Sequence, residues 1–224
     1  MAFGEVGKFV EELPFAGRLS EREKEDLIAG TKAVTYAKGE HIHGGNENCT
    51  GVVFVNKGCI RAYMLSEEGR ETTLYRLYEG DFCMLSASCI LEAVTFDVFI
   101  DAEEDTDAFL IKTSAFRQLT ENNVYVENFA LHTTVERFSD VMWTMQQILF
   151  MSMDKRLAVF LYDEAVKKGS NILKITHEQI ARYIGSAREV VSRMLKYFAN
   201  ENIVSLSRNG ITIEDKNKLL ALTK

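Results

Sequence analysis

The chain has 224 residues, of which 46% are hydrophobic, and this is enough for two domains of ordinary size. The sequence has no signal peptide and no apolar run near the roughly 18 residues of a membrane-spanning helix, so we expect a cytoplasmic protein without membrane segments. The four cysteines lack the spacing that is typical of small disulfide-bonded domains, so we expect no disulfide framework. The net charge of −7 is unevenly divided along the chain. Residues 1–153 contain 13 Lys and Arg and 25 Asp and Glu, whereas residues 154–224 contain 13 Lys and Arg and 8 Asp and Glu. Only the C-terminal third therefore has a positive net charge that would attract phosphates.

The first third of the chain changes from helical to strand patterns. Residues 3–12 and 20–30 have the spacing of short amphipathic helices, and Ser20 with Glu23 forms a predicted capping box. From Val34 to Ile111, short strands alternate with glycine-containing turns, at 51–58, 59–66, 71–82 and 96–111. Many short strands with regular turns predict a small antiparallel barrel or jelly roll.

Four short motifs follow one another along these strands. They are K-G-E (Lys38–Glu40), V-N-K-G (Val55–Gly58), E-E-G-R-E (Glu67–Glu71) and E-G-D-F (Glu79–Phe82). This succession resembles the cyclic-nucleotide-binding type of barrel. The resemblance implies that residues 1–121 form an effector-sensing domain.

The segment after E-G-D-F departs from the cAMP-binding members of that family. Those members hold the cyclic phosphate with an Arg-Ser pair, but residues 83–102 contain no arginine, and the pair falls at about Phe96 and Asp97. An aspartate repels a phosphate, and Val141 and Met142 stand where polar contacts to the base would be expected. We therefore expect an effector other than cAMP. One alternative is a small hydrophobic or aromatic ligand, for which the candidate pocket residues are Cys83, Cys89, Phe96, Val141 and Met142.

Cysteines and histidines leave two further effector chemistries open. Cys83 and Cys89 are either small buried hydrophobes or a redox-sensing pair, which would require lowered thiol pKa values and access. His41 and His43, with His132 elsewhere, are either solvated side chains or ligands of a metal or haem. The N-terminal region has no cysteine before Cys49, so an iron–sulfur cluster of the oxygen-sensing type is not expected, and the sequence predicts no cofactor.

A long helix is predicted from about Asn122 to Phe150. Eight of its residues follow an unbroken 4-3 spacing, at Val124, Asn128, Leu131, Val135, Phe138, Met142, Met145 and Leu149. A strict heptad seam over nearly four heptads favours a partner helix over packing on the chain's own barrel, so we predict a parallel homodimer. Asn128, the one polar member, would fix the register of the two helices.

The last third of the chain has the pattern of a winged helix. A helix over 154–169 ends at Gly169, and Ile175–Phe198 contains two helices separated by Gly185. Thr176 with Gln179 and Ser186 with Glu189 are the predicted caps of these two helices. A hairpin over 202–215 and a short helix over 215–222 complete the domain, with Arg208 at the tip of the wing.

One side of the second of these helices is polar and carries candidate contacts to DNA. Arginine can donate two hydrogen bonds to guanine, and a carboxylate can accept one from cytosine. The candidate contacts are Thr176, Ser186, Arg188, Glu189, Ser192, Arg193, Lys196 and Arg208. Taken alone, such residues are also typical of a solvated helix face.

The R-E-x-x-S-R pattern over 188–193 resembles the helix-turn-helix of the Crp/Fnr family of bacterial transcription regulators, and it is closer to the Fnr branch than to the cAMP-receptor branch. The resemblance implies sequence-specific binding to palindromic double-stranded DNA with half-sites similar to TTGAT. It also implies RNA polymerase as a partner and a small effector as the signal.

Together these patterns predict an α+β fold with three parts. Residues 1–121 would form an antiparallel double-stranded β-helix (jelly-roll) barrel, residues 122–153 a dimerisation helix and hinge, and residues 154–224 a winged helix-turn-helix. No nucleophile–base pair, metal motif or glycine-rich phosphate loop is present, so we do not expect an enzyme. The alternative function is a ligand- or redox-sensing barrel whose helix-turn-helix serves protein contacts.

Overall fold

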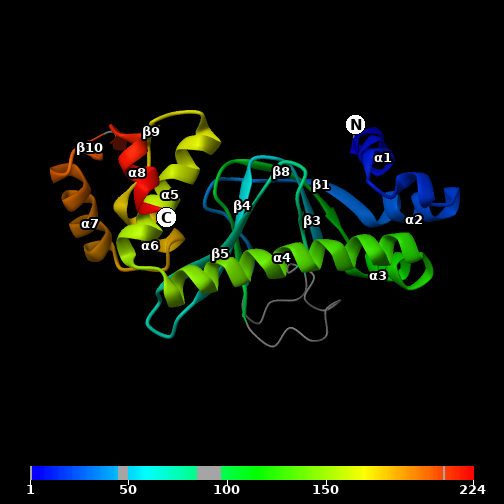
Figure 1. Cartoon of the computed structure of the whole chain (residues 1–224). Helices are drawn as coiled ribbons and strands as arrows, with labels where there is room; N and C mark the ends of the chain where they lie inside the picture. The colour runs from blue at the N-terminus through cyan, green and yellow to red at the C-terminus, as the bar shows by residue number, and fades with distance from the viewer. Residues whose placement is uncertain (1, 45–49, 85–96, 209) are drawn as a thin grey trace. The chain divides into compact units, whose positions relative to one another are not determined.

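The computed structural model describes residues 2–44, 50–84, 97–208 and 210–224 (Figure 1). The chain divides into two compact units. The barrel unit consists of Met1–Leu65 and Leu74–Val141, and the winged-helix unit consists of Ser66–Thr73 and Met142–Lys224. Across the described ranges, none of the helices combines the length and the apolar character needed to span a membrane.

Two four-stranded sheets form the barrel, in the orders β1-β8-β3-β6 and β2-β7-β4-β5, and only the first three residues of β5 are grouped with the other unit. The strands are β1 (Thr31–Tyr36), β2 (His41–His43), β3 (Val52–Lys57), β4 (Cys59–Leu65), β5 (Glu71–Tyr78), β6 (Phe82–Cys83), β7 (Phe99–Ala102) and β8 (Thr106–Ile111). Neighbouring strands run antiparallel, as in the pairs Val34–Ala108 and Ile60–Ala102. The predicted antiparallel jelly-roll fold is therefore confirmed.

Two separate hydrophobic cores lie on the two faces of the β1-β8-β3-β6 sheet. Val53 and Val55 point into the core between the two sheets, whereas Val52 and Phe54 point to the other side. This alternation follows from the two-residue period of a strand. The outer core is closed by α1 (Ala2–Glu12), η1 (Ala16–Arg18), α2 (Glu21–Gly30) and α3 (Thr113–Asn122).

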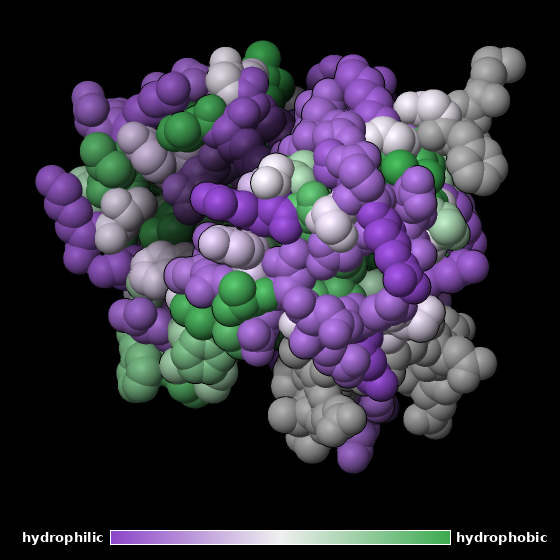
Figure 2. Space-filling model, turned by 90° about the vertical axis from the view of Figure 1, so that its right-hand side faces the viewer, coloured by the Kyte–Doolittle hydropathy of each residue, from purple (hydrophilic) through white to green (hydrophobic). Residues whose placement is uncertain are grey.

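The helices on this outer side are amphipathic, as predicted. The capping box at Ser20 is present, because Ser20 Oγ accepts from the Glu23 amide and Glu23 Oε2 accepts from the Ser20 amide at 2.7 Å. Hydrophilic residues dominate the face on which α1, α2 and α3 lie, with smaller hydrophobic areas between them (Figure 2). These helices expose their polar sides and contribute their apolar sides to the outer core.

The long helix α4 (Val124–Phe150) follows α3 after a one-residue interruption. The prediction started it at Asn122, but Asn123 is extended and its Oδ1 accepts from the Tyr125 amide at 3.1 Å, so the side chain caps a new helix there. One face of α4 carries its buried residues, Val126 and Thr133.

The opposite face of α4 is uncovered. All eight residues of the predicted seam are exposed, and the seven apolar ones keep between 45% and 66% of their surface. A continuous apolar stripe of this kind on a single chain indicates an interaction surface.

The winged-helix unit contains α5 (Met153–Lys168), α6 (His177–Tyr183), α7 (Arg188–Asn200), α8 (Lys216–Leu222) and a small sheet. The sheet has the order β10-β11-β9, with β9 (Ile172–Leu173), β10 (Val204–Ser207) and β11 (Gly210–Ile213). Its core includes Leu161, Ile180, Leu195 and Phe198, all less than 2% exposed. The predicted stop of α5 is present, since Gly169 has φ +58 and ends the helix in the left-handed conformation.

Two of the predicted strand segments are each divided in the structure. The segment 71–82 turns at Glu79–Gly80 between β5 and β6, and the segment 96–111 turns at residues 103–105 between β7 and β8. Gly80 has φ +91, which the strand pattern alone did not indicate. The short strand β9 was also not predicted, because two residues carry too little periodicity to be recognised.

Candidate nucleic-acid interface

The helix-turn-helix is built from α6, a short turn and α7. Thr176 Oγ1 accepts from the Gln179 amide, and Gln179 Oε1 accepts from the Thr176 amide at 2.9 Å, so the predicted capping box starts α6. Gly185 has φ +60, and the turn is fixed on α5 by Arg156, whose Nη1 donates to the Ile184 carbonyl at 3.0 Å. The turn therefore places α7 at a defined angle on the unit's core.

The start of α7 differs from the prediction. Ser186 was predicted to cap this helix together with Glu189, but the N-cap residue is Ala187 and no side chain caps the helix. The Ser186 amide instead donates to the Ala181 carbonyl at 2.9 Å and so belongs to the end of α6. Glu189 is therefore not part of a capping box, and its carboxylate has no hydrogen bond or ion pair within the described part of the chain.

One face of α7 is apolar and the other is charged. Val191, Leu195 and Phe198 are buried in the core, which follows from the helical spacing of the sequence. The charged residues of the opposite side are all exposed: Arg188, Glu189, Arg193 and Lys196. The outward-facing surface expected from the sequence is therefore present on the helix that the turn presents.

His177 is a member of this surface that the sequence did not reveal. It is the first residue of α6, and its Nδ1 is joined to Ser192 Oγ on α7 by a hydrogen bond of 2.8 Å. The pKa of His177 is lowered, first by burial and then by the positive charges of Arg188 and Lys196. Ser192 is half-buried, and its hydroxyl can still make a further hydrogen bond. A sequence motif gives no sign of this contact, because its two residues lie on different helices.

The wing places a further cation on the unit. β10 and β11 pair in the predicted hairpin, with Val204 opposite Ile213 and Ser207 opposite Gly210. Gly210 has φ +133, and a Cβ there would lie 2.2 Å from the Leu173 carbonyl oxygen, so only glycine fits. Arg208 is exposed at the turn of this hairpin, as predicted.

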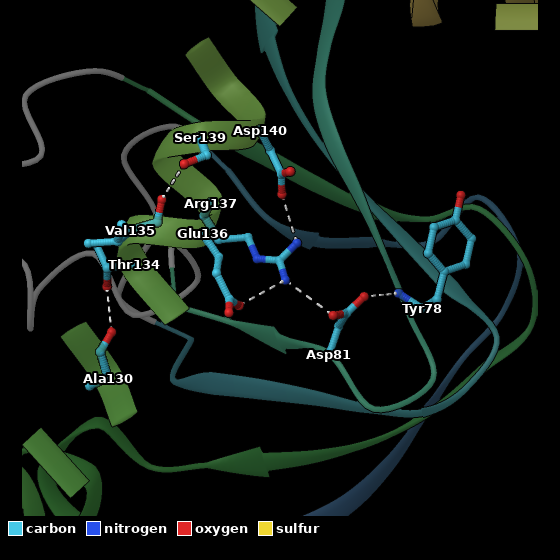
Figure 3. Close-up of polar contacts among 9 residues, drawn as sticks. All are labelled: Tyr78, Asp81, Ala130, Thr134, Val135, Glu136, Arg137, Ser139 and Asp140. Carbon is cyan, nitrogen blue, oxygen red and sulfur yellow. Dashed lines mark hydrogen bonds and ion pairs between the residues drawn. The ribbon is translucent and has the colours of Figure 1, made fainter. Parts of the chain in front are cut away.

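In the barrel unit, an ionic network links α4 to the turn between β5 and β6 (Figure 3). Arg137 of α4 pairs with Asp81 at 3.2 Å and with Asp140 at 2.9 Å. The other oxygen of Asp81 accepts from the Tyr78 amide at 2.8 Å. Burial raises the pKa of Asp140. The Asp81 side chain thus connects the strand turn with the helix.

Two buried polar atoms beside this network have no hydrogen-bond partner among the described residues. They are the hydroxyl of Tyr75 and Nε of Arg137, whose guanidinium lies 5.7 Å from the centre of the Tyr75 ring. Tyr75 is 6% exposed, and burial raises its pKa well above the usual value. Unsatisfied buried polar groups are rare in proteins, so this junction between barrel and helix is a candidate ligand site.

The candidate effector residues have different environments. Cys83 is fully buried in the inner core, Val141 packs partly against that core, and Met142 is 45% exposed. Cys89 and Phe96 lie outside the described residues. Burial and the charge of Glu103 raise the pKa of the Cys59 thiol to about 12, which disfavours the reactive thiolate there.

The histidines of the barrel have protein partners. His41 Nδ1 lies 2.7 Å from Asp101 Oδ1, and the buried His43 is hydrogen-bonded to Thr50 at 3.1 Å. Among the residues that the structure covers, no three His, Cys, Asp or Glu side chains are grouped as metal ligands would be.

A jelly-roll barrel, a long helix with an uncovered apolar stripe, and a winged helix with an exposed basic face define a two-domain DNA-binding regulator. Known protein families agree with this class. Residues 33–123 match the cyclic nucleotide-binding domain, and residues 155–222 match the Crp-like helix-turn-helix domain.

Individual proteins narrow the class further. A crystal structure of a Crp/Fnr-family transcriptional regulator from Eubacterium rectale is 44% identical, covers 94% of this chain and 98% of its own, and superimposes with a TM-score of 0.90. The cAMP-activated global transcriptional regulator CRP of Pasteurella multocida is 25% identical over 79% of this chain and 87% of its own length. The fumarate and nitrate reduction regulatory protein of Yersinia pestis is 24% identical over 94% of this chain and 85% of its own.

This chain belongs to the Crp/Fnr family, and it is a transcription regulator with a DNA-binding helix-turn-helix and a cyclic-nucleotide-binding type of barrel. Members of this family bind DNA and act as dimers. The alternative in which the helix-turn-helix serves only protein contacts is thereby set aside.

We predict that the substitution Tyr75→Phe leaves the free energy of unfolding unchanged or raises it by about 1 kcal/mol, because it removes a buried hydroxyl without a partner. Urea denaturation of the purified protein measures this change. Tyr125→Phe, at an exposed position on α4, is the control and should have no effect. A loss of more than about 1 kcal/mol in Tyr75→Phe would show that the hydroxyl is already hydrogen-bonded.

A second prediction concerns the pH dependence of stability. Because the pKa of His177 is lower in the folded chain than in the unfolded one, the unfolded state takes up the proton first as the pH falls. His177 therefore reduces stability as the pH drops below about 6.5. Thermal unfolding from pH 8 to pH 5 should show a smaller loss of stability in His177→Gln than in the wild type.

The exposed His132 supplies the control for this experiment. His132→Gln should retain the pH dependence of the wild type. If His177→Gln and the wild type lose stability in parallel, the effect assigned to His177 is wrong.

Proposed function

We propose that a homodimer of this chain inserts its two α7 helices into successive major grooves of a palindromic DNA site. Glu189 and Arg193 read base edges, and Arg188 and Ser192 contact bases or phosphates. The observation that supports this proposal is the exposed charged face of α7, on which Glu189 makes no hydrogen bond within the described chain. The remaining contacts to the DNA backbone come from Thr176, Ser186, Lys196 and Arg208.

The choice of bases follows from hydrogen-bond chemistry. A carboxylate can accept from the amino group of cytosine, and an arginine can donate two hydrogen bonds to guanine. The resemblance of residues 188–193 to the Fnr branch points to an inverted repeat with half-sites similar to TTGAT. The positive balance of the C-terminal third supplies the attraction to phosphates that does not depend on sequence.

The dimer is proposed to form along the seam of α4. The apolar seam residues are exposed in the single chain, whereas Val126 and Thr133 on the other face are buried. Pairing two such stripes in parallel would bury them and place Asn128 opposite its copy. A two-fold axis also matches the symmetry of a palindromic site.

The effector is proposed to bind at the junction of barrel and α4, beside the Tyr75 hydroxyl and Nε of Arg137. These buried atoms favour a ligand with hydrogen-bonding groups, and the exposed Asp97 argues against the phosphate of cAMP. A ligand bound there would change how α4 is held through the Arg137–Asp81 ion pair. It would shift the population of DNA-domain orientations at the hinge over 151–154.

Other parts of the proposal follow from the family. The three-part division at residues 121 and 153, a cytoplasmic location, and RNA polymerase as a partner are consistent with a bacterial transcription regulator. Transcription regulators of this family are generally not enzymes, and we propose no catalytic role for this chain.

The first test of this function measures how well the variant Glu189→Ala discriminates between bases. We expect the variant to accept several bases at one position of each half-site, with discrimination reduced by about 1–3 kcal/mol there. Fluorescence anisotropy on a set of palindromes with single base changes measures this discrimination. A uniform loss of affinity on all sequences would show that Glu189 does not read a base.

Arg208→Ala is the matched comparison for this test. Because Arg208 is assigned to a phosphate, its removal should weaken binding to all sequences alike and reduce the slope of log affinity against log salt by about 1. The two variants therefore separate base reading from backbone contact on the same DNA.

A separate prediction concerns the seam. Phe138→Glu should raise the dissociation constant of the dimer at least about 100-fold, because each protomer loses the burial of an aromatic side chain and gains a charge in the seam. Analytical ultracentrifugation measures the change.

Ser139→Glu places the same charge one residue further along α4, at an exposed position that flanks the seam and that coiled coils often fill with Glu or Lys, and it should leave the dimer intact. A stable dimer in Phe138→Glu would place the interface elsewhere on the molecule.

A further inference from the structure

The barrel unit has a hollow on its outer side, between α1 and the β1-β8-β3-β6 sheet. Its volume is about 360 Å³, and its walls are α1 on one side and the turn Glu79–Gly80 with Asn56 on the other. This volume lies at the lower end of the range of small-molecule sites. The hollow is distinct from the junction beside Tyr75, because it lies on the opposite face of this sheet.

The floor of the hollow is aromatic. Phe9 of α1 stacks on Phe109 of β8 with ring centroids 4.2 Å apart, and Phe54 of β3 lies 4.9 Å from Phe9. Phe9 and Phe109 are buried, whereas Phe54 is only half-buried and presents part of its ring to the hollow. The faces of aromatic rings carry partial negative charge and attract cations.

The rim of the hollow is acidic on both walls. Glu5 and Glu12 extend from α1, and Glu79 stands on the opposite wall. The only cation among the lining residues, Lys8, pairs with Glu12 at 3.6 Å. Glu5 and Glu79 make no ion pair or hydrogen bond within the described chain, so two uncompensated carboxylates face one aromatic floor.

We propose that this hollow binds a small monovalent organic cation with an apolar body, of the arylalkylamine or quaternary ammonium class. The apolar body lies on Phe54 and the neighbouring rings, and the charged head lies between Glu5 and Glu79. The volume of about 360 Å³ suits a small molecule and is too small for a peptide helix. The acidic balance of residues 1–153 draws cations to this unit and repels anions.

This site makes the barrel a receptor with two separate positions for small molecules. The hollow is formed by α1, the outer face of the sheet and the turn Glu79–Gly80, and its lining includes none of the junction residues Tyr75, Asp81 and Arg137. The hollow therefore does not depend on the DNA-binding role or on the effector proposed above.

Isothermal titration calorimetry of the full-length protein with three matched probes tests this proposal. We expect 2-phenylethylamine to bind, and both the neutral 2-phenylethanol and the anionic 3-phenylpropionate to bind at least about 10-fold more weakly, because only the amine is attracted by the rim and the rings. The binding of the amine should weaken as salt is added. Equal binding of the three probes, or no binding of the amine, would overturn the proposal.

Substitutions locate the binding. Glu5→Gln and Glu79→Gln should each weaken the amine about 3- to 10-fold, because each removes one charge of the rim without changing its shape. Phe54→Leu should weaken it while keeping an apolar floor. Glu121→Gln changes an exposed carboxylate of α3 that does not line the hollow, and it should bind the amine as the wild type does.

The Glu→Gln variants keep the test interpretable if Phe54→Leu fails to fold. Both glutamates are exposed, so their thermal unfolding midpoints should equal that of the wild type. Wild-type affinity in both Glu5→Gln and Glu79→Gln would show that the amine binds elsewhere, and the proposed site would then be wrong.

Discussion

The organisation of this protein depends on the two opposite faces of α4. One face carries Val126, Thr133 and Arg137, which fix the helix on the barrel by apolar packing and by the ion pair to Asp81. The other face keeps a continuous apolar stripe uncovered. A helix with only one apolar face could serve either the barrel or a partner, but not both. Because the seam residues follow a strict 4-3 spacing, they stay on one side of α4 and leave the other side free to pack on the barrel.

Most of the fold was recognisable from local patterns. Capping boxes at Ser20 and Thr176 and the positive φ of Gly169 and Gly185 depend on residues close in sequence, so the helix boundaries they define were predicted. The split of the strand segment at Gly80 and the two-residue strand β9 were missed. Strand β9 depends on its pairing with β11, which is distant in sequence. The turn at Gly80 is local, because the Asp81 amide donates to the Tyr78 carbonyl, but the alternation of apolar residues continues across it.

The candidate site was predictable to the same extent. Outward-facing residues of α7 follow from helical periodicity, and they were predicted as a set. The hydrogen bond of His177 to Ser192 and the network of Arg137, Asp81 and Asp140 were not predicted, because each joins residues from separate elements or turns. The prediction that Ser186 caps α7 was wrong because it did not take account of the backbone of the preceding helix. The Ser186 amide is already bonded to Ala181, so the backbone there completes α6 and cannot begin α7.

The Arg137–Asp81 ion pair has a geometric consequence in a symmetric assembly. Arg137 and Phe138 are consecutive on one stiff helix, so any roll of α4 that relaxes the pair also turns the apolar stripe by the same angle. In a parallel two-fold dimer, symmetry makes the partner helix roll in the same sense about the direction of the shared axis. Both apolar stripes would then turn away from the axis together, so the fit of the whole seam would depend on one ion pair in each barrel.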